Sequence, residues 1–274
     1  MEPLGEGRFA ARLDERWNCP VVPQGGIVAA TAARAMATAL ADPTQQLRSF
    51  NGVFAGQVGH GPIEVDVKVL RRGRSMSQLH ASLRNPGMEA GFDAFGVFGA
   101  EREGFTFTDL TPPTGLTPPL ECPSFRDPAP EDIDRLHFNF WDHVQGRPTI
   151  GHAPWDDYEP VSSLCAFWYR FDDPPRADDG TWDPLALLAL CDTMPGAVGE
   201  RLGPEARQRR WLPPSADLTV HVLDNARSEW VLGVNRARHA GQGYASADME
   251  LWDLEAAPRL VAYGTQTMLF SFPK

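Results

Sequence analysis

Three polar side chains in the second half of the chain have types and surroundings that could perform chemistry: Asp192, Ser215 and Gln266. Asp192 follows Leu185 by seven residues and Leu188 by four, so a helix here places its carboxylate on an apolar face. Burial of an unpaired carboxylate costs roughly several kcal/mol. The acid therefore either caps a helix end or serves as the general base for a reacting water.

Ser215 and Gln266 are candidates to hold that water. Ser215 follows two prolines at the entry of a predicted strand, and the chain has no G-x-S-x-G nucleophile elbow, so hydrogen bonding fits better than nucleophilic attack. Gln266 interrupts the apolar inward set of the last predicted strand, and its amide can donate to and accept from one water. The alternatives are a serine that only begins a strand, and a glutamine that is a satisfied core residue or points outward.

The elements that must position these side chains occur twice along the chain. A run of small and apolar residues predicts a buried helix over 25–40. A second helix is predicted from Pro184, with Asp183 as its N-cap and a kink at Pro195, which cannot donate to the carbonyl of Cys191. Runs of period-two alternation predict antiparallel strands after each helix. After the first helix the runs are LRSFNGVFAGQ, PIEVDVKVL, SMSQLHASL and AGFDAFGVFGAE. After the second helix they are ADLTVHVL, EWVLGVNRARHAG, GYASADMELWD and RLVAYGTQTMLFSF. A further predicted strand, LCAFWYRF, comes before the second helix.

A proline-rich segment separates the two sets of elements. Ten prolines fall between Pro112 and Pro160, which predicts a connector without lasting regular structure, although residues 131–146 are apolar enough to pack back on the body. The fold class is therefore α+β, with two tandem helix-plus-antiparallel-sheet halves, residues 1–110 and 161–274, that join into one continuous sheet across the connector 111–160. The first helix carries no carboxylate, so one active site per chain is expected, in the second half.

Composition excludes several classes of protein. The 274 residues carry a net charge of -11 and a pI near 5.1, which argues against a dominant basic surface for nucleic acid or anionic membranes. No apolar run approaches the roughly 18 residues of a membrane span, and the N-terminus is acidic where a signal peptide is basic, so a cytoplasmic protein is expected. The four cysteines lack zinc spacing and are expected to be reduced thiols, at least two of them buried. No metal or cofactor is expected.

Several motifs, taken in their order and spacing, resemble the double-hotdog acyl-CoA thioesterases, the family typified by bacterial acyl-CoA thioesterase II. They are QGGIVAATAARAM and PIEVDVKVLRRGRSMS in the first half, and DPLALLALCDTMPGAV, PPSADLTVHVL, RHAGQGYASADMELWD and VAYGTQTML in the second. The resemblance runs from about Trp17 to the C-terminus and skips the proline-rich connector. It implies hydrolysis of acyl-CoA to free acid and coenzyme A, with a water positioned by Asp192, Ser215 and Gln266.

Contacts to the substrate and to a second chain are also expected. The resemblance implies that the helix start at Gly25 and Gly26 contacts the thioester carbonyl. Arg74, Arg238 and His239 are candidates to contact coenzyme A, the alternative being ordinary solvated charges at strand ends. Exposed sheet edges predict a homodimer.

Two other functions compete with thioester hydrolysis. A catalytically silent acyl-CoA or lipid-binding hotdog protein is disfavoured because the acid, hydroxyl and amide are all present at the matched positions. An enoyl-thioester hydratase is disfavoured because no Asp or Asn followed five residues later by His stands at the start of the second helix.

Overall fold

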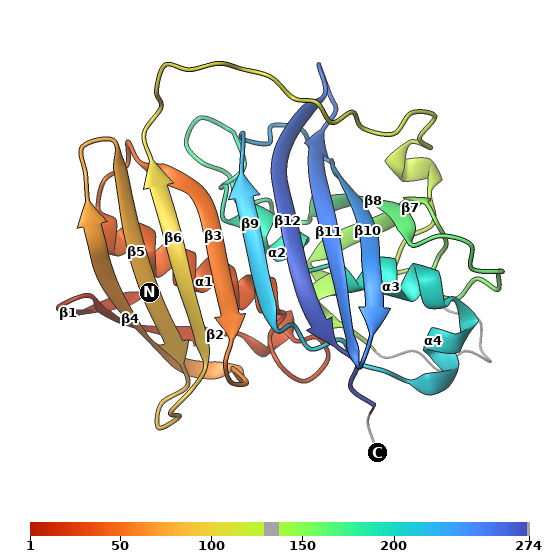
Figure 1. Ribbon diagram of the computed structural model, residues 1–274, viewed down its shortest axis with the longest axis horizontal. Coiled ribbons are helices and arrows are strands. Elements are labelled where there is room, and N and C mark those ends of the chain that lie inside the picture. Colours follow the sequence, from red (N-terminus) through yellow and green to blue (C-terminus); the bar gives the residue numbers. More distant parts are fainter. Residues whose placement is uncertain (129–136, 273–274) are drawn as a thin grey trace.

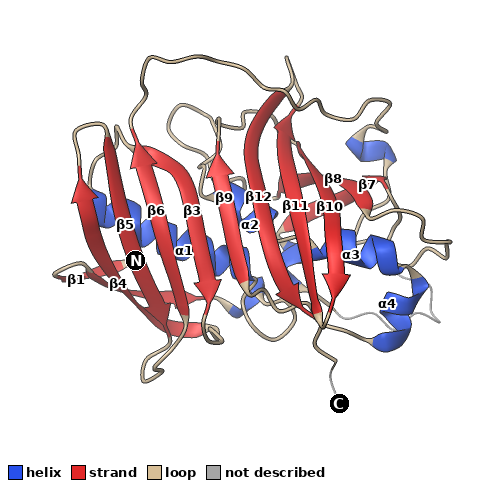
Figure 2. Ribbon diagram, viewed as in Figure 1, coloured by secondary structure: helices blue, strands red, loops and turns tan. Residues whose placement is uncertain are grey.

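The computed structural model describes residues 1–128 and 137–272, which form one large sheet with helices on one of its faces (Figures 1 and 2). The elements in chain order are β1 (Glu2–Gly5), β2 (Arg8–Leu13), η1 (Glu15–Trp17), α1 (Gly25–Leu40), β3 (Gln46–Phe54), β4 (Gly61–Arg72), β5 (Met76–Arg84), β6 (Phe92–Gly99), η2 (Pro119–Glu121), η3 (Asn139–Asp142), β7 (Val144–Ile150), β8 (Leu164–Phe171), α2 (Ala186–Cys191), α3 (Pro195–Leu202), α4 (Pro204–Arg209), β9 (Asp217–Val222), β10 (Val231–Gly241), β11 (Tyr244–Asp253) and β12 (Arg259–Leu269).

The twelve strands confirm the predicted continuous sheet and show the duplication directly. Their order is β1-β2-β4-β5-β6-β3-β9-β12-β11-β10-β8-β7, which is the same six-strand arrangement read in opposite directions from the seam between β3 and β9. At that seam Phe50 lies opposite Val220 in an antiparallel ladder, and both side chains are fully buried. In the first half β3 pairs with β6, and in the second half β9 pairs with β12. In each half the first strand after the helix thus lies beside the last strand, so neither half is a simple meander.

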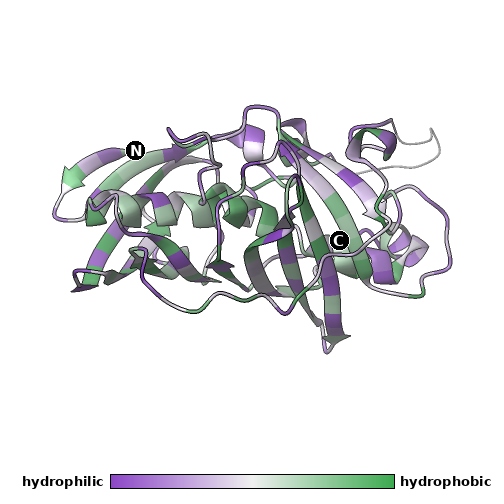
Figure 3. Cartoon of the chain, turned by 90° about the horizontal axis from the view of Figure 1, so that it is seen from above, coloured by the Kyte–Doolittle hydropathy of each residue, from purple (hydrophilic) through white to green (hydrophobic). Residues whose placement is uncertain are grey.

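Helix α1 has the predicted bounds because its sequence satisfies every local requirement of a buried helix. The Gln24 side chain caps its first turn by accepting a hydrogen bond from the Ile27 N–H, and Ala41 ends it in the left-handed conformation. Alanines cover the buried face, and their small side chains let the sheet approach closely. A Cβ at Gly96 of β6 would stand only 2.6 Å from the Met36 sulfur. Figure 3 shows the sheet curving over the helices, with hydrophobic and hydrophilic residues alternating along the strands.

The second helical region is broken where the sequence predicts a kink. Helix α2 ends at Cys191, Asp192 is its C-cap, and Pro195 begins α3. The start of α2 differs from the prediction by a few residues. The Asp183 carboxylate accepts from the Leu185 N–H at 3.1 Å, but the helix begins only at Ala186.

The prediction of a connector without regular structure is wrong for part of that segment. Strand β7 lies within it and pairs with β8 at one end of the sheet. Pro148 is tolerated there because an edge strand leaves one side of its backbone unpaired. The apolar middle packs on the body as expected where it is described, with Phe140 and Val144 fully buried, while residues 129–136 lie outside the described part. Strands β1 and β2, the counterparts of β7 and β8, were not predicted from the sequence.

The remaining expectations concern thiols and membrane spans. All four cysteines are free, and Cys122, Cys165 and Cys191 are buried, as predicted. Over residues 1–128 and 137–272, no helix is long and apolar enough to cross a membrane.

Candidate active site

Asp192, Ser215 and Gln266 converge into one hydrogen-bonded cluster. The Ser215 hydroxyl donates to Oδ1 of Asp192 at 3.0 Å, and Nε2 of Gln266 donates to the same oxygen at 2.5 Å. Nε2 of Gln266 also lies 2.9 Å from the Ser215 oxygen. Because the acid ends α2, the hydroxyl precedes β9 and the amide lies on β12, three separate elements contribute to the cluster.

The start of α1, from the first half of the chain, completes this cluster. The main-chain N–H of Gly26 donates to Oδ2 of Asp192 at 2.9 Å. A Cβ at Gly25 would lie 3.0 Å from the same oxygen, and one at Gly26 would lie 2.5 Å from the Leu188 carbonyl oxygen of α2. Only residues without a side chain allow the two helix ends to approach this closely. The positive end of the α1 dipole therefore faces the carboxylate directly.

Gln24 fixes the two helix ends relative to one another, and sequence reasoning missed it. Its side chain is buried, caps α1 through Oε1, and donates through Nε2 to the Ala189 carbonyl of α2 at 2.8 Å. The only local signal is its place just before Gly25, and glutamine is not among the residues that favour helix N-caps. The bond to Ala189 joins positions 165 residues apart, so no sequence pattern could indicate it.

Two effects on the pKa of Asp192 oppose each other. Burial raises it, and the hydrogen bonds from Gly26, Ser215 and Gln266 lower it, but burial is the larger effect and the pKa is about 6. A carboxylate with this pKa is largely ionised at neutral pH and still basic enough to accept a proton. The neighbouring thiols cannot replace it as the reactive group. Burial and the charge of Asp192 raise the pKa of Cys19 to about 12 and that of Cys191 further, so both stay protonated.

The remaining hydrogen-bonding capacity of the cluster suits a water molecule. Oδ1 of Asp192 accepts two side-chain hydrogen bonds, whereas Oδ2 accepts from the backbone at the start of α1 and has no side-chain donor among the described residues. Oε1 of Gln266 is buried and accepts from no residue in the described part of the chain, so it can accept from water or substrate. The side-chain partners of Ser215 are an acid and an amide, not the histidine that a serine nucleophile requires.

The cluster does not include the basic side chains proposed from the sequence. Arg74 is exposed in the turn between β4 and β5, and four strands separate β4 from β12. Arg238 forms an ion pair with Asp248 of β11. The residue opposite Gln266 is Ala247, the neighbour of Asp248. Because successive side chains of a strand alternate between faces, Asp248 faces the other side of the sheet from Gln266. His239, also on β10, is exposed. Within the ranges described, no three His, Cys, Asp or Glu side chains are grouped as metal ligands.

Comparisons with solved structures show the same fold over nearly the whole chain. A protein of unknown function with a hotdog fold from Alicyclobacillus acidocaldarius is 25% identical, with a TM-score of 0.79, over 99% of this chain and 96% of the other. An acyl-CoA thioesterase II, TesB2, from Mycobacterium marinum is 21% identical, with a TM-score of 0.73, over 100% of this chain and 96% of the other. No sequence among curated proteins matches significantly.

Family models match both halves of the sequence. The model of the acyl-CoA thioesterase N-terminal domain matches residues 13–99, and that of the C-terminal domain matches residues 119–270. The second match contains Asp192, Ser215 and Gln266 and covers more than half of the chain. The chain therefore belongs to the acyl-CoA thioesterase family.

Proposed function

We propose that this protein hydrolyses acyl-CoA to a free acid and coenzyme A, with Asp192 as general base. One observation carries the proposal: a buried carboxylate, a hydroxyl and an amide converge within hydrogen-bonding distance, and a second helix directs a backbone N–H at the carboxylate. Family membership supports the substrate class. The assignment of roles rests on the geometry.

The proposed reaction begins with a water that donates to Oδ2 of Asp192 and is oriented by Oε1 of Gln266. As the water oxygen bonds to the thioester carbonyl carbon, one water proton passes to Asp192. The tetrahedral intermediate then collapses, the carbon–sulfur bond breaks, and the leaving sulfur of coenzyme A takes the proton from the acid. Asp192 is thereby returned to its ionised form, and Ser215 and Gln266 hold it in one orientation throughout.

We assign the helix start at Gly25 and Gly26 a role in this chemistry that differs from the one the resemblance implies. A thioester carbonyl needs donors where its negative charge develops, and the resemblance assigns that role to this helix start. The Gly26 N–H is instead already bonded to Asp192. We therefore assign to it the stabilisation of the ionised base, and to the positive field of α1 the polarisation of a carbonyl that lies beside it.

Release of free thiol from a panel of acyl-CoAs tests the proposed activity. We expect turnover with at least one acyl chain. Binding of acyl-CoA without thiol release would favour the silent binding protein. Loss of the enoyl double bond without thiol release would favour the hydratase.

We also propose that two chains form a homodimer. The edge strands β1 and β7 end the sheet with one unpaired side each, which favours association. Light scattering coupled to gel filtration measures the mass, and a monomer at micromolar concentration would contradict the proposal.

A further inference from the structure

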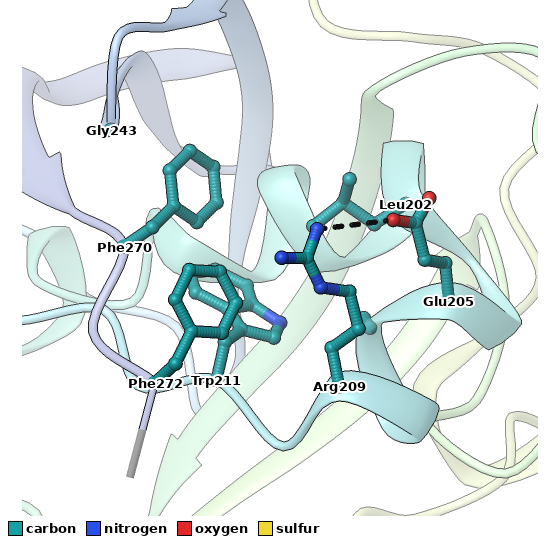
Figure 4. Close-up of a pocket in the computed structure, with 8 residues that line it drawn as sticks. Leu202, Glu205, Arg209, Trp211, Gly243, Phe270 and Phe272 are labelled. Atoms are coloured by element: carbon teal, nitrogen blue, oxygen red, sulfur yellow. Dashed lines mark hydrogen bonds and ion pairs between the residues drawn. The ribbon is translucent and has the colours of Figure 1, made fainter. Parts of the chain in front are cut away.

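An aromatic pocket lies beside α4, at the end of β12 that follows the active-site glutamine (Figure 4). Its cavity measures about 240 Å³ and is lined by Leu202, Glu205, Arg209, Trp211, Phe270 and Phe272, among others. The rings of Trp211 and Phe270 have centroids 5.1 Å apart, and the Arg209 guanidinium carbon lies 4.5 Å from the centroid of Phe272. The cavity is smaller than the roughly 300 Å³ at which sites for whole small molecules begin, so it suits one end of a longer ligand.

A continuous backbone ladder connects this pocket with the active site. Trp211 precedes Ser215 by four residues, and Phe270 follows Gln266 by four, one residue beyond the end of β12. The two segments pair through Ser215 opposite Met268 and through reciprocal bonds between Leu212 and Ser271. Four residues of extended chain span about 13 Å. A ligand with its thioester at Asp192 can therefore reach the pocket only through a long arm.

The charge at the pocket contrasts with that of the whole chain. Arg209 lines the pocket beside Glu205, and Arg210 follows it directly before Trp211, in a protein whose net charge is -11. Aromatic faces beside a guanidinium are the features that bind a purine base together with phosphate groups. An acyl chain is apolar and carries no charge that could pair with an arginine.

From this combination we propose that the pocket binds the adenine nucleotide of coenzyme A. This inference rests on the proposed function, since it extends the same substrate from the thioester to its far end. The adenine stacks on the rings of Trp211 and Phe272, and Arg209 donates to a phosphate. The ion pair between Arg209 and Glu205 does not oppose this, because its atoms are 3.5 Å apart on exposed side chains and the guanidinium keeps further donors.

Calorimetric titration with desulfo-coenzyme A tests the site without any turnover. The full-length chain should bind this analogue, and Arg209→Ala should weaken binding roughly tenfold or more, as expected for lost charge-assisted hydrogen bonds. Glu205→Gln removes a competing acceptor and should tighten binding. Lys68→Ala serves as the matched control, because it removes an exposed basic side chain on β4, separated from β12 by four strands, and should leave binding unchanged. Phe272→Ala, at a half-exposed ring, should also weaken binding.

Kinetics with two thioesters of the same acyl group separate this proposal from the proposed function. Arg209→Ala should raise KM for the acyl-CoA and leave KM for the acyl-N-acetylcysteamine thioester, which lacks the nucleotide, unchanged. Absence of turnover with either thioester would contradict the thioesterase but not the nucleotide site. Unaltered affinity of Arg209→Ala for desulfo-coenzyme A, or a KM effect that grows with acyl length in both thioesters, would overturn the pocket assignment.

Discussion

The N–H of Gly26 at the start of α1 donates to Oδ2 of Asp192 at the end of α2, across 166 residues of sequence. A helix of one half thus stabilises the carboxylate of the other. This relationship gives the duplication a chemical role in addition to a structural one, because the first half contributes no titratable group to the cluster but supplies the dipole that keeps its acid ionised.

The pH dependence of kcat/KM should report the pKa of Asp192. Burial raises this pKa to about 6, and a general base works only in its ionised form. We therefore expect kcat/KM for acyl-CoA to fall about tenfold for each pH unit below about 6 and to level above it. Initial rates of thiol release in constant-ionic-strength buffers measure this profile. A flat profile between about pH 5 and pH 8 would exclude Asp192 as the base.

The Ser215 hydroxyl should support Asp192 rather than attack the substrate. It donates to Oδ1 and accepts from Gln266, so Ser215→Ala removes one hydrogen bond to the charged acid. We expect kcat to fall roughly tenfold to a hundredfold, the effect of losing a bond to a charged group. Ser215→Thr keeps the hydroxyl and should retain most activity. Abolition of activity in both variants, or trapping of an acyl group on Ser215, would show that the serine has another role.

Gln24 is a positioning residue in this account, and two substitutions separate its two bonds. Gln24→Asn preserves a helix-capping acceptor but is too short to reach Ala189, whereas Gln24→Leu loses the cap as well. With α1 and α2 less firmly joined, the Gly26 N–H should stabilise the carboxylate less, so the midpoint of the kcat/KM profile should move above 6 in Gln24→Asn. The pH–rate profile measures this shift, and thermal unfolding should show the larger loss of stability in Gln24→Leu. An unmoved midpoint with lowered stability would reduce Gln24 to a structural role.

Local patterns explain which parts of the fold could be predicted from the sequence. Helix α1 follows from an unbroken run of small apolar residues, and the break after Cys191 follows from Pro195, since each depends on neighbouring positions only. Strand β7 could not be recognised, because Pro148 argues against a strand until its place at the sheet edge is known.

In the candidate site, too, some features follow from the sequence and others depend on tertiary packing. Residue types and the family resemblance identify Asp192, Ser215 and Gln266, but the contacts of Gly26 and Gln24 arise from packing between halves, which no local spacing encodes. Arg238 shows what the residue type alone leaves open. Its type suits phosphate binding, but the pairing of β11 with β12 puts its partner Asp248 on the face away from Gln266.

The acid should cost the fold stability at neutral pH. Its pKa rises from the ordinary value of 3.8 to about 6 on folding, so well below pH 4 both states are protonated and the penalty is small. As the pH rises through this interval the unfolded state loses its proton first, and folding is disfavoured. Relative to wild type, the free energy of unfolding of Asp192→Asn should therefore increase by about 2 kcal/mol between about pH 4 and pH 8. Urea unfolding at both pH values measures the difference. Parallel changes in the two proteins would contradict the raised pKa.

The most direct test of the central claim compares thiol release by wild type and Asp192→Asn on the best acyl-CoA of a panel. The substitution keeps the size and shape of the side chain but removes the base, so kcat should fall by about 10²- to 10⁴-fold. Unchanged affinity for desulfo-coenzyme A would show that the substrate surface is intact. If Asp192→Asn turns over acyl-CoA at the wild-type rate, Asp192 is not the base and the proposed mechanism is wrong.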